Sequence, residues 1–269
     1  MIPALSRRAL LAATPVALGG VLLEGAPTLA SRPAWDEGVP DAYPTQDPEI
    51  VREVVGKSHF DLDRVRALVE PRPELARAAW DWGFGDWETA LGAASHTGRR
   101  EIAEYLVEKG ARPDLFTFAM LGHVDVVRAL VAAQPGIQRL PGPHGITLLA
   151  HAQAGGERAR ETVAFLERLG GADARPVDLP LDEAVRRELL GRYVFGAGER
   201  DRFEVDVDRN DQLSLCRAGG VSRALFHRGD REFHPAGAPS VSVRFAPVNG
   251  EARELEIHNP ELVLRAARS

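Results

Sequence analysis

Side chains suited to binding or catalysis gather in residues 80–87, which read Trp-Asp-Trp-Gly-Phe-Gly-Asp-Trp. Large aromatic side chains are typical anchors of protein interfaces, and the glycines on both sides of Phe84 would let it project from a loop. The alternative is that the aromatic residues pack against the end of neighbouring helices. We predict Trp82 and Phe84 as partner-binding residues, with Asp81 and Asp86 beside them, and we expect Trp87 to lie in the core.

A second distinctive loop, Gly-Pro-His-Gly at residues 142–145, presents His144 next to a proline that limits its freedom. We add His144 to the predicted partner-binding residues. The same residue supports a different hypothesis, an unrecognised hydrolase in which His144 is the base and Asp81 or Asp86 orients it. That hypothesis requires the imidazole and a carboxylate to lie within hydrogen-bond reach.

Familiar catalytic signatures do not occur: the chain contains no Gly-x-Ser-x-Gly, no phosphate-binding loop and no His-Glu-x-x-His. A metal ion needs three or four ligands that converge. His96 and His123 lie in equivalent turns between short helices, where hydrogen bonding to the turn is the ordinary role. We therefore predict no catalytic residue, no metal site and no cofactor.

The elements that would position these loops are short helices with a repeated pattern. Residues 89–94 (Thr-Ala-Leu-Gly-Ala-Ala) and 147–152 (Thr-Leu-Leu-Ala-His-Ala) each begin with a threonine that can cap a helix through its hydroxyl. Gly98 and Gly122 lie in the following turns, where a positive φ is easily accepted. The second helix of each pair carries an apolar stripe with a leucine at the equivalent position. These leucines are Leu68, Leu106, Leu130 and Leu166.

This pattern resembles the ankyrin repeat, whose signature is Thr-Pro-Leu-His-x-Ala in units of about 33 residues. The resemblance covers residues 47–174 and implies a solenoid of about four stacked helix pairs that binds protein partners. It also implies that residues 80–87 and 142–145 occupy the projecting finger loops. The proline and histidine of the signature are absent from both copies. The interval from Leu106 to Leu130 is too short for a finger, so we expect the third unit to lack one.

After a predicted helix at residues 182–190, the apolar period changes to two, as in Phe203, Val205 and Val207. About eight short strands fit a small antiparallel barrel or coiled sheet. This region resembles the lipocalin-like domain at the C-terminus of many serine β-lactamase-like hydrolases, although the Ser-x-x-Lys of those hydrolases is absent. The residues that carry the resemblance are Leu190 to Tyr193, the Phe203 strand, Leu213, Phe233, the Val241 strand and Leu264 to Arg268. The predicted fold class is therefore α+β, with a helical domain at 47–174 and a barrel domain at 182–269.

The N-terminal residues 1–30 have the order of an export signal. Arg7 and Arg8 precede an apolar run, and Thr28 and Ala30 are the small residues that a signal peptidase reads. The paired arginines resemble a twin-arginine signal, so we expect a periplasmic or secreted protein. Linkers are predicted at 31–46 and 175–181. A formal net charge of -6 does not favour nucleic-acid binding, and no membrane span is expected after signal cleavage.

These features together predict an exported, non-catalytic binding protein that uses the ankyrin-like groove to bind a protein partner. Two alternatives remain open. One is the hydrolase described above. The other is a small-ligand carrier, which would show a cavity inside the barrel lined by Phe203, Leu213 and Phe245 in place of a filled core.

Overall fold

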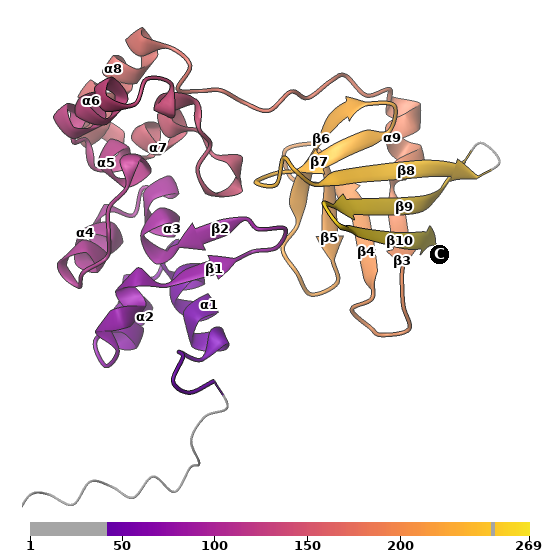
Figure 1. The fold of residues 1–269 in the computed structure, drawn as a ribbon, viewed down its shortest axis with the longest axis horizontal. Helices are drawn as coiled ribbons and strands as arrows, with labels where there is room; N and C mark the ends of the chain where they lie inside the picture. The colour runs from indigo at the N-terminus through magenta and orange to yellow at the C-terminus, as the bar shows by residue number, and fades with distance from the viewer. Residues whose placement is uncertain (1–41, 249–250) are drawn as a thin grey trace, which may run out of the picture. The chain divides into compact units, whose positions relative to one another are not determined.

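The computed structural model describes residues 42–248 and 251–269, which form a helical region followed by a β-barrel (Figure 1). The predicted signal peptide, most of the first linker and the Asn249–Gly250 turn lie outside these residues. Within them, no helix is both long and apolar enough to cross a membrane. The α+β class and the barrel of about eight strands are confirmed by this part of the chain.

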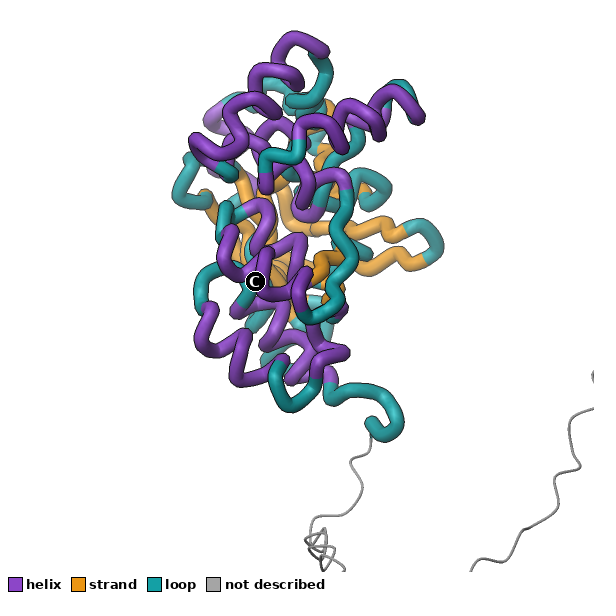
Figure 2. The backbone as a smooth tube through the Cα atoms, turned by 90° about the vertical axis from the view of Figure 1, so that its left-hand side faces the viewer, coloured by secondary structure: helices purple, strands orange, loops and turns teal. Residues whose placement is uncertain are grey.

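The helical region is built from short helices that follow one another as antiparallel pairs (Figure 2). Each helix is too short to be stable alone, so its apolar stripe must be buried against neighbouring helices. Of the four aligned leucines, Leu68, Leu106 and Leu166 are buried. The helices are α1 (Pro48–Lys57), α2 (Leu62–Val69), α3 (Ala90–His96), α4 (Arg100–Glu108), α5 (Leu115–Leu121), α6 (Val124–Ala133), α7 (Leu148–Ala154) and α8 (Arg160–Leu169), with 3-10 turns η1 (Pro73–Arg77), η2 (Ile137–Arg139), η3 (Pro143–Gly145) and η4 (Gly156–Ala159).

Helix starts and turns follow the sequence signals. The hydroxyl of Thr89 accepts a hydrogen bond from the N–H of Gly92 at 2.8 Å, and Thr147 caps α7 in the same way. Gly98 and Gly122 have φ values of +67° and +79°, and a Cβ atom on either would lie 2.2 Å from a backbone oxygen. Glycine is therefore required at both turns for conformation and for space.

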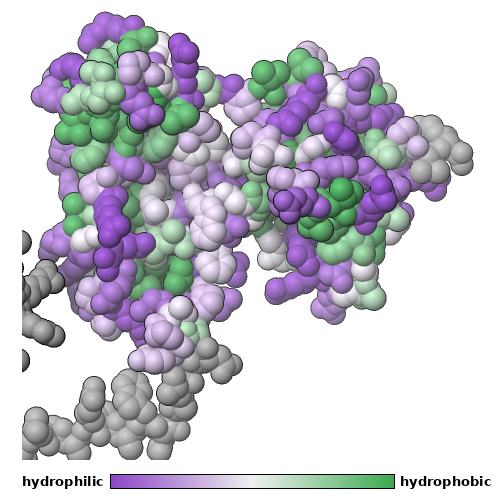
Figure 3. All heavy atoms as spheres, viewed as in Figure 1, coloured by the Kyte–Doolittle hydropathy of each residue, from purple (hydrophilic) through white to green (hydrophobic). Residues whose placement is uncertain are grey.

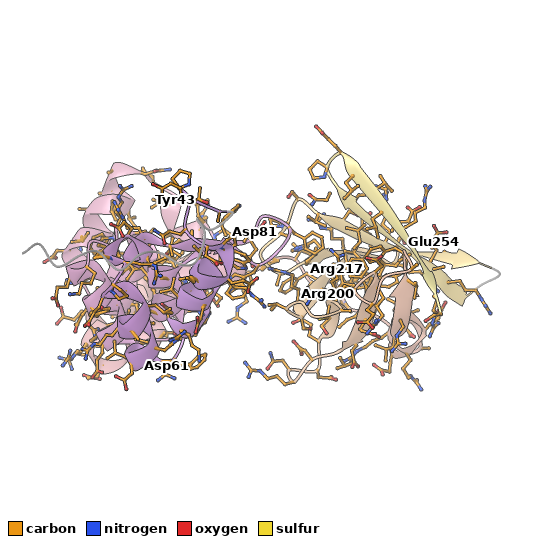
Figure 4. All side chains as sticks on the ribbon, turned by 90° about the horizontal axis from the view of Figure 1, so that it is seen from below. Tyr43, Asp61, Asp81, Arg200, Arg217 and Glu254 are labelled. Carbon is orange, nitrogen blue, oxygen red and sulfur yellow. The ribbon has the colours of Figure 1, made fainter. Side chains whose placement is uncertain are left out.

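The first of the two predicted finger loops is a two-stranded hairpin, β1 (Ala79–Asp81) and β2 (Trp87–Thr89), joined by residues 82–86. Asp81, labelled in Figure 4, ends β1, and its carboxylate accepts a hydrogen bond from the N–H of Gly83 at 2.8 Å. Residues 109–114, between α4 and α5, contain no strand. The loop between α6 and α7 contains η2 and η3 instead of a hairpin.

The C-terminal region begins with helix α9 (Glu183–Leu189) and continues as eight antiparallel strands in the order β10-β3-β4-β5-β6-β7-β8-β9, which close into a barrel (Figure 1). Each strand pairs with its neighbours in the chain, and β10 closes the barrel by pairing with β3. The strands are β3 (Gly191–Val194), β4 (Arg202–Val207), β5 (Leu213–Arg217), β6 (Arg223–Gly229), β7 (Glu232–Pro235), β8 (Ser242–Val248), β9 (Glu251–Asn259) and β10 (Leu262–Arg268).

Alternation along the strands places apolar side chains inside the barrel, where aromatic rings make edge-to-face contacts. The ring centroid of Phe245 lies 5.6 Å from those of Tyr193 and Phe233, and all three residues are buried. The middle of the barrel is thus occupied by side chains.

Polar residues cover most of the face of the molecule shown in Figure 3, with hydrophobic patches between them.

Candidate functional site

Both finger loops contain a residue held in the left-handed region of φ, Phe84 in the hairpin and His144 in η3, each at +60°. A non-glycine residue in this conformation costs on the order of 1 kcal/mol or more and often marks a functional position. Gly83 and Gly85 on either side of Phe84 also have positive φ values. The chain therefore maintains strain at two of the residues that the sequence singles out.

The aromatic residues of the hairpin are not arranged as expected. Trp87, predicted to lie in the core, is 63% exposed, because the pleat of β2 turns the neighbouring residue inward instead. Trp82 is half-buried against the core of α1 to α4. Phe84 is half-buried against the apolar cluster of the barrel, so it already has a partner within its own chain.

Glu88 is the residue that β2 turns inward, and its side chain is fully buried. Its Oε2 atom accepts a hydrogen bond from the indole N–H of Trp82 at 2.7 Å. Three histidine Nε2 atoms surround the same carboxylate. Their distances to its nearer oxygen are 2.9 Å for His96, 3.3 Å for His144 and 3.5 Å for His59.

Asp86 holds the outer side of His144. One carboxylate oxygen of Asp86 lies 2.7 Å from Nδ1 of His144, and the other accepts a hydrogen bond from the backbone N–H of His144 at 2.9 Å. Arg223 of β6 donates to Asp86 at 2.7 Å. Asp86 and Arg223 are buried and His144 is partly exposed, so the three groups form a largely buried charged network in which each charge has a partner.

These contacts set the protonation states. Burial alone would raise the pKa of Glu88, but hydrogen bonds from His144 and His96 outweigh it and lower that pKa to about 2. Burial alone would lower the pKa of His144, but hydrogen bonds to Asp86 and Glu88 raise it to about 9. At neutral pH, Glu88 is therefore anionic and His144 is an imidazolium.

His59, Glu88, His96 and His144 could hold a metal ion, since each offers one ligand atom and these atoms lie within 4.8 Å of one another. The rings of His96 and His144 are 5.5 Å apart, centroid to centroid, and those of His59 and His96 are 4.9 Å apart. The structure thus brings together His96, expected in a turn between helices, and His144 of the loop at residues 142–145.

Sequence reasoning missed Glu88 and His59. Glu88 lies among aromatic residues in a short strand, where an acidic residue is unusual, and this is the signal that could have identified it. His59 follows the end of α1 and carries no comparable signal. Of the five residues predicted for partner binding, Trp82, Asp86 and His144 contact this cluster or belong to it, whereas Asp81 and Phe84 do not.

A pocket of about 770 Å³ lies between the two finger loops and the start of the second linker. The exposed indole of Trp87 forms part of its wall, and Asp86 lies at its inner side. Such a volume is within the range of ligand-binding pockets. Its other lining residues include Phe116, Pro141, Pro143, Arg139, Arg175, Arg228 and His234.

No protein-family model matches this chain, and no curated protein sequence matches it. Among solved structures, those titled "Crystal structure of SurE" and "Crystal structure of SurE with D-Leu" align with 23% and 22% identity and TM-scores of 0.26 and 0.25. Each alignment covers 44% of this chain and 28% of the other. Similarity at this level carries no functional conclusion.

Proposed function

We propose that this chain is an exported, non-catalytic binding protein in which about four ankyrin-like repeats present a recognition surface to a protein partner. The observation that carries this proposal is the pocket of about 770 Å³ between the two finger loops. In an ankyrin-like scaffold, the finger loops and inner helices are the parts that remain free to bind. Export through the twin-arginine route is part of the same proposal and rests on Arg7 and Arg8.

The chemistry of the pocket favours an acidic segment of the partner that also carries an apolar side chain. Trp87 is 63% exposed there, and arginine and tryptophan are the residues most enriched at binding hot spots. Three arginines line the pocket. The guanidinium of Arg139 makes no hydrogen bond or ion pair with the described residues, so it is available to a carboxylate.

The hydrolase alternative meets its geometric requirement, because the imidazole of His144 and the carboxylate of Asp86 lie 2.7 Å apart. Its chemical requirement is less well supported. A general base must be unprotonated, whereas contacts with two carboxylates raise the pKa of His144 to about 9. The Nε2 atom of His144 also faces the Glu88 carboxylate at 3.3 Å. These observations favour a non-catalytic protein.

The carrier alternative requires a cavity lined by Phe203, Leu213 and Phe245. Phe245 instead packs against Tyr193 and Phe233 in the middle of the barrel. Phe203 contributes to a smaller pocket of about 320 Å³, together with Trp82 and Phe84 of the hairpin. A filled centre favours a structural role for the barrel.

The test is a pull-down from envelope extracts with the purified chain and two pocket variants, Trp87→Ala and Arg139→Glu. Matched controls outside the pocket are Phe60→Ala, whose side chain is similarly exposed, and Arg160→Glu. A true partner is retained by the wild-type chain and both controls and is lost with both pocket variants. With that partner purified, each pocket variant should raise the dissociation constant by roughly 30-fold, as expected for a hot spot of about 2 kcal/mol. Equal retention by all five proteins would contradict the proposed surface.

A further inference from the structure

The cluster around Glu88 has the donor set of a transition-metal site. Three imidazole nitrogens and one carboxylate oxygen are ligands that Zn²⁺ commonly takes in proteins, and neutral imidazole also suits other first-row divalent ions. The four side chains come from four separate segments: the turn after α1, strand β2, the end of α3 and η3. A chance surface cluster would not be expected to place three imidazole rings around a fully buried carboxylate.

The nitrogen atoms that face away from Glu88 are held as they are in known metal sites. Nδ1 of His59 lies 3.0 Å from the carbonyl oxygen of Gly56, and Nδ1 of His144 lies 2.7 Å from a carboxylate oxygen of Asp86. Metal-binding histidines almost always donate their second ring N–H to a carbonyl or carboxylate. In both residues this contact leaves Nε2 directed inward.

The carboxylate is held in a similar way. Trp82 donates its indole N–H to Oε2 of Glu88 at 2.7 Å, which leaves Oε1 toward His96 and His144. Four donors at about 2.1 Å from a tetrahedral ion are separated from one another by about 3.4 Å. The distance from Oε1 of Glu88 to Nε2 of His144, 3.3 Å, is close to this separation, and Nε2 of His59 lies 3.5 Å from the other oxygen, Oε2. Only the 2.9 Å contact with His96 would need to lengthen by a few tenths of an ångström.

We propose that His59, Glu88, His96 and His144 together bind one divalent transition-metal ion, with Zn²⁺ as the best fit. Binding of the ion displaces the proton that Nε2 of His144 otherwise carries. The ion would join the first helix pair, the hairpin, α3 and the second finger loop. A site with four protein ligands is typical of structural zinc. The single cysteine excludes an intrachain disulfide. The ion would therefore crosslink the two finger loops through Glu88 and His144, as a disulfide does in other proteins. This inference concerns a site separate from the Trp87 pocket and does not depend on the partner.

The experiment uses the purified full chain without a histidine tag, stripped with a chelator and titrated with Zn²⁺ against a chromophoric competitor. About one equivalent per chain is expected. Titration with Co²⁺ should give the intense visible absorption of a tetrahedral site, a readout of geometry that folding alone would not produce. The variants His96→Gln and Glu88→Gln should lose stoichiometric binding of both ions.

His123→Gln is the matched control, since His123 lies in the equivalent turn before α6 and is outside the cluster. It should bind one equivalent, like the wild-type chain. Circular dichroism establishes that each variant is folded. If Glu88→Gln or His96→Gln fails to fold, His59→Gln takes its place, because His59 is partly exposed and its removal leaves less buried polarity. Uptake of no ion by the wild-type chain, or equal uptake by the cluster variants, would overturn the inference.

Discussion

The two carboxylate oxygens of Asp86 hold His144 at two points, Nδ1 at 2.7 Å and the backbone N–H at 2.9 Å. This pairing fixes the ring of a residue whose backbone is in the left-handed region. A strained backbone conformation persists only where the surrounding contacts hold it. Asp86 is thus the residue that determines where the Nε2 atom of His144 points.

Asp86→Asn tests this role. The amide keeps the shape of the side chain but not its charge. Loss of a carboxylate that hydrogen-bonds a metal-binding histidine typically costs 10-fold to 100-fold in metal affinity. We expect the competitor titration to show Zn²⁺ binding weakened by about that factor, still at one equivalent. Asp81→Asn is the control, because its carboxylate contacts Gly83 and not the cluster. An unchanged affinity in Asp86→Asn would assign Asp86 to folding alone.

The stability of the metal-free chain should depend on pH through His144. Its folded pKa of about 9 lies above the ordinary value of 6.5, so the folded state binds the proton more tightly. This contribution is fully present below pH 6.5 and is lost as pH rises toward 9. Burial lowers the pKa of His59, so protonation of His59 reduces the free energy of unfolding only below pH 6.5.

Urea denaturation in the presence of a chelator measures this dependence. The free energy of unfolding should fall between pH 6.5 and 9 by an amount on the order of 2 kcal/mol. His144→Gln should remove most of the slope, whereas His123→Gln should retain it. A slope that is the same in all three proteins would show that other groups are responsible.

The two tryptophans on either side of the hairpin tip should differ in their effect on stability. Trp82→Ala removes a half-buried ring and the hydrogen bond to Glu88, so we expect the free energy of unfolding to fall by about 2 kcal/mol or more. Trp87→Ala removes a ring that is 63% exposed, and its effect should stay within about 0.5 kcal/mol. Equal losses in urea denaturation would contradict the observed difference in burial between the two rings.

The turn after α5 should tolerate no side chain. At Gly122, with φ of +79°, an added Cβ would lie 2.2 Å from the carbonyl oxygen of Arg158. Gly122→Ala should therefore cost roughly 3 kcal/mol or more through strain and overlap together. Gly110 is the control, because its φ is +94° but nothing lies within 4 Å of an added Cβ. Gly110→Ala should cost about 1 to 2 kcal/mol, from strain alone.

Export is predicted from the sequence alone. Replacing Arg7 and Arg8 with lysine should trap the precursor in the cytoplasm, because the twin-arginine route reads both guanidinium groups. Immunoblots of cytoplasmic and envelope fractions provide the measurement, with Arg32→Lys as the control beyond the signal. N-terminal sequencing of exported protein should begin at Ser31. Exported material that begins at Met1 would contradict cleavage, and normal export of the double variant would indicate the Sec route.

The sequence was sufficient for features that depend on neighbouring residues. Thr89 and Thr147 cap helices as predicted, since a cap is formed within three residues of chain. The alternation through Phe203 and Val205 gave the barrel strands, because period and turn residues together define a strand and its inward face. Helix caps and strand alternation depend on residues that are close together in the chain, so a single sequence is enough to predict them.

Tertiary structure alone decided the arrangement around Glu88. The four side chains of the cluster are contributed by residues 59 to 144, and no local pattern specifies which turns of stacked helices meet. The same limit explains the aromatic loop: Trp82 and Phe84 lie between glycines, yet packing across the fold covers them and leaves Trp87 exposed. Burial is a property of the whole packed chain, so the sequence identified the important loops but not the side chains that face the cluster.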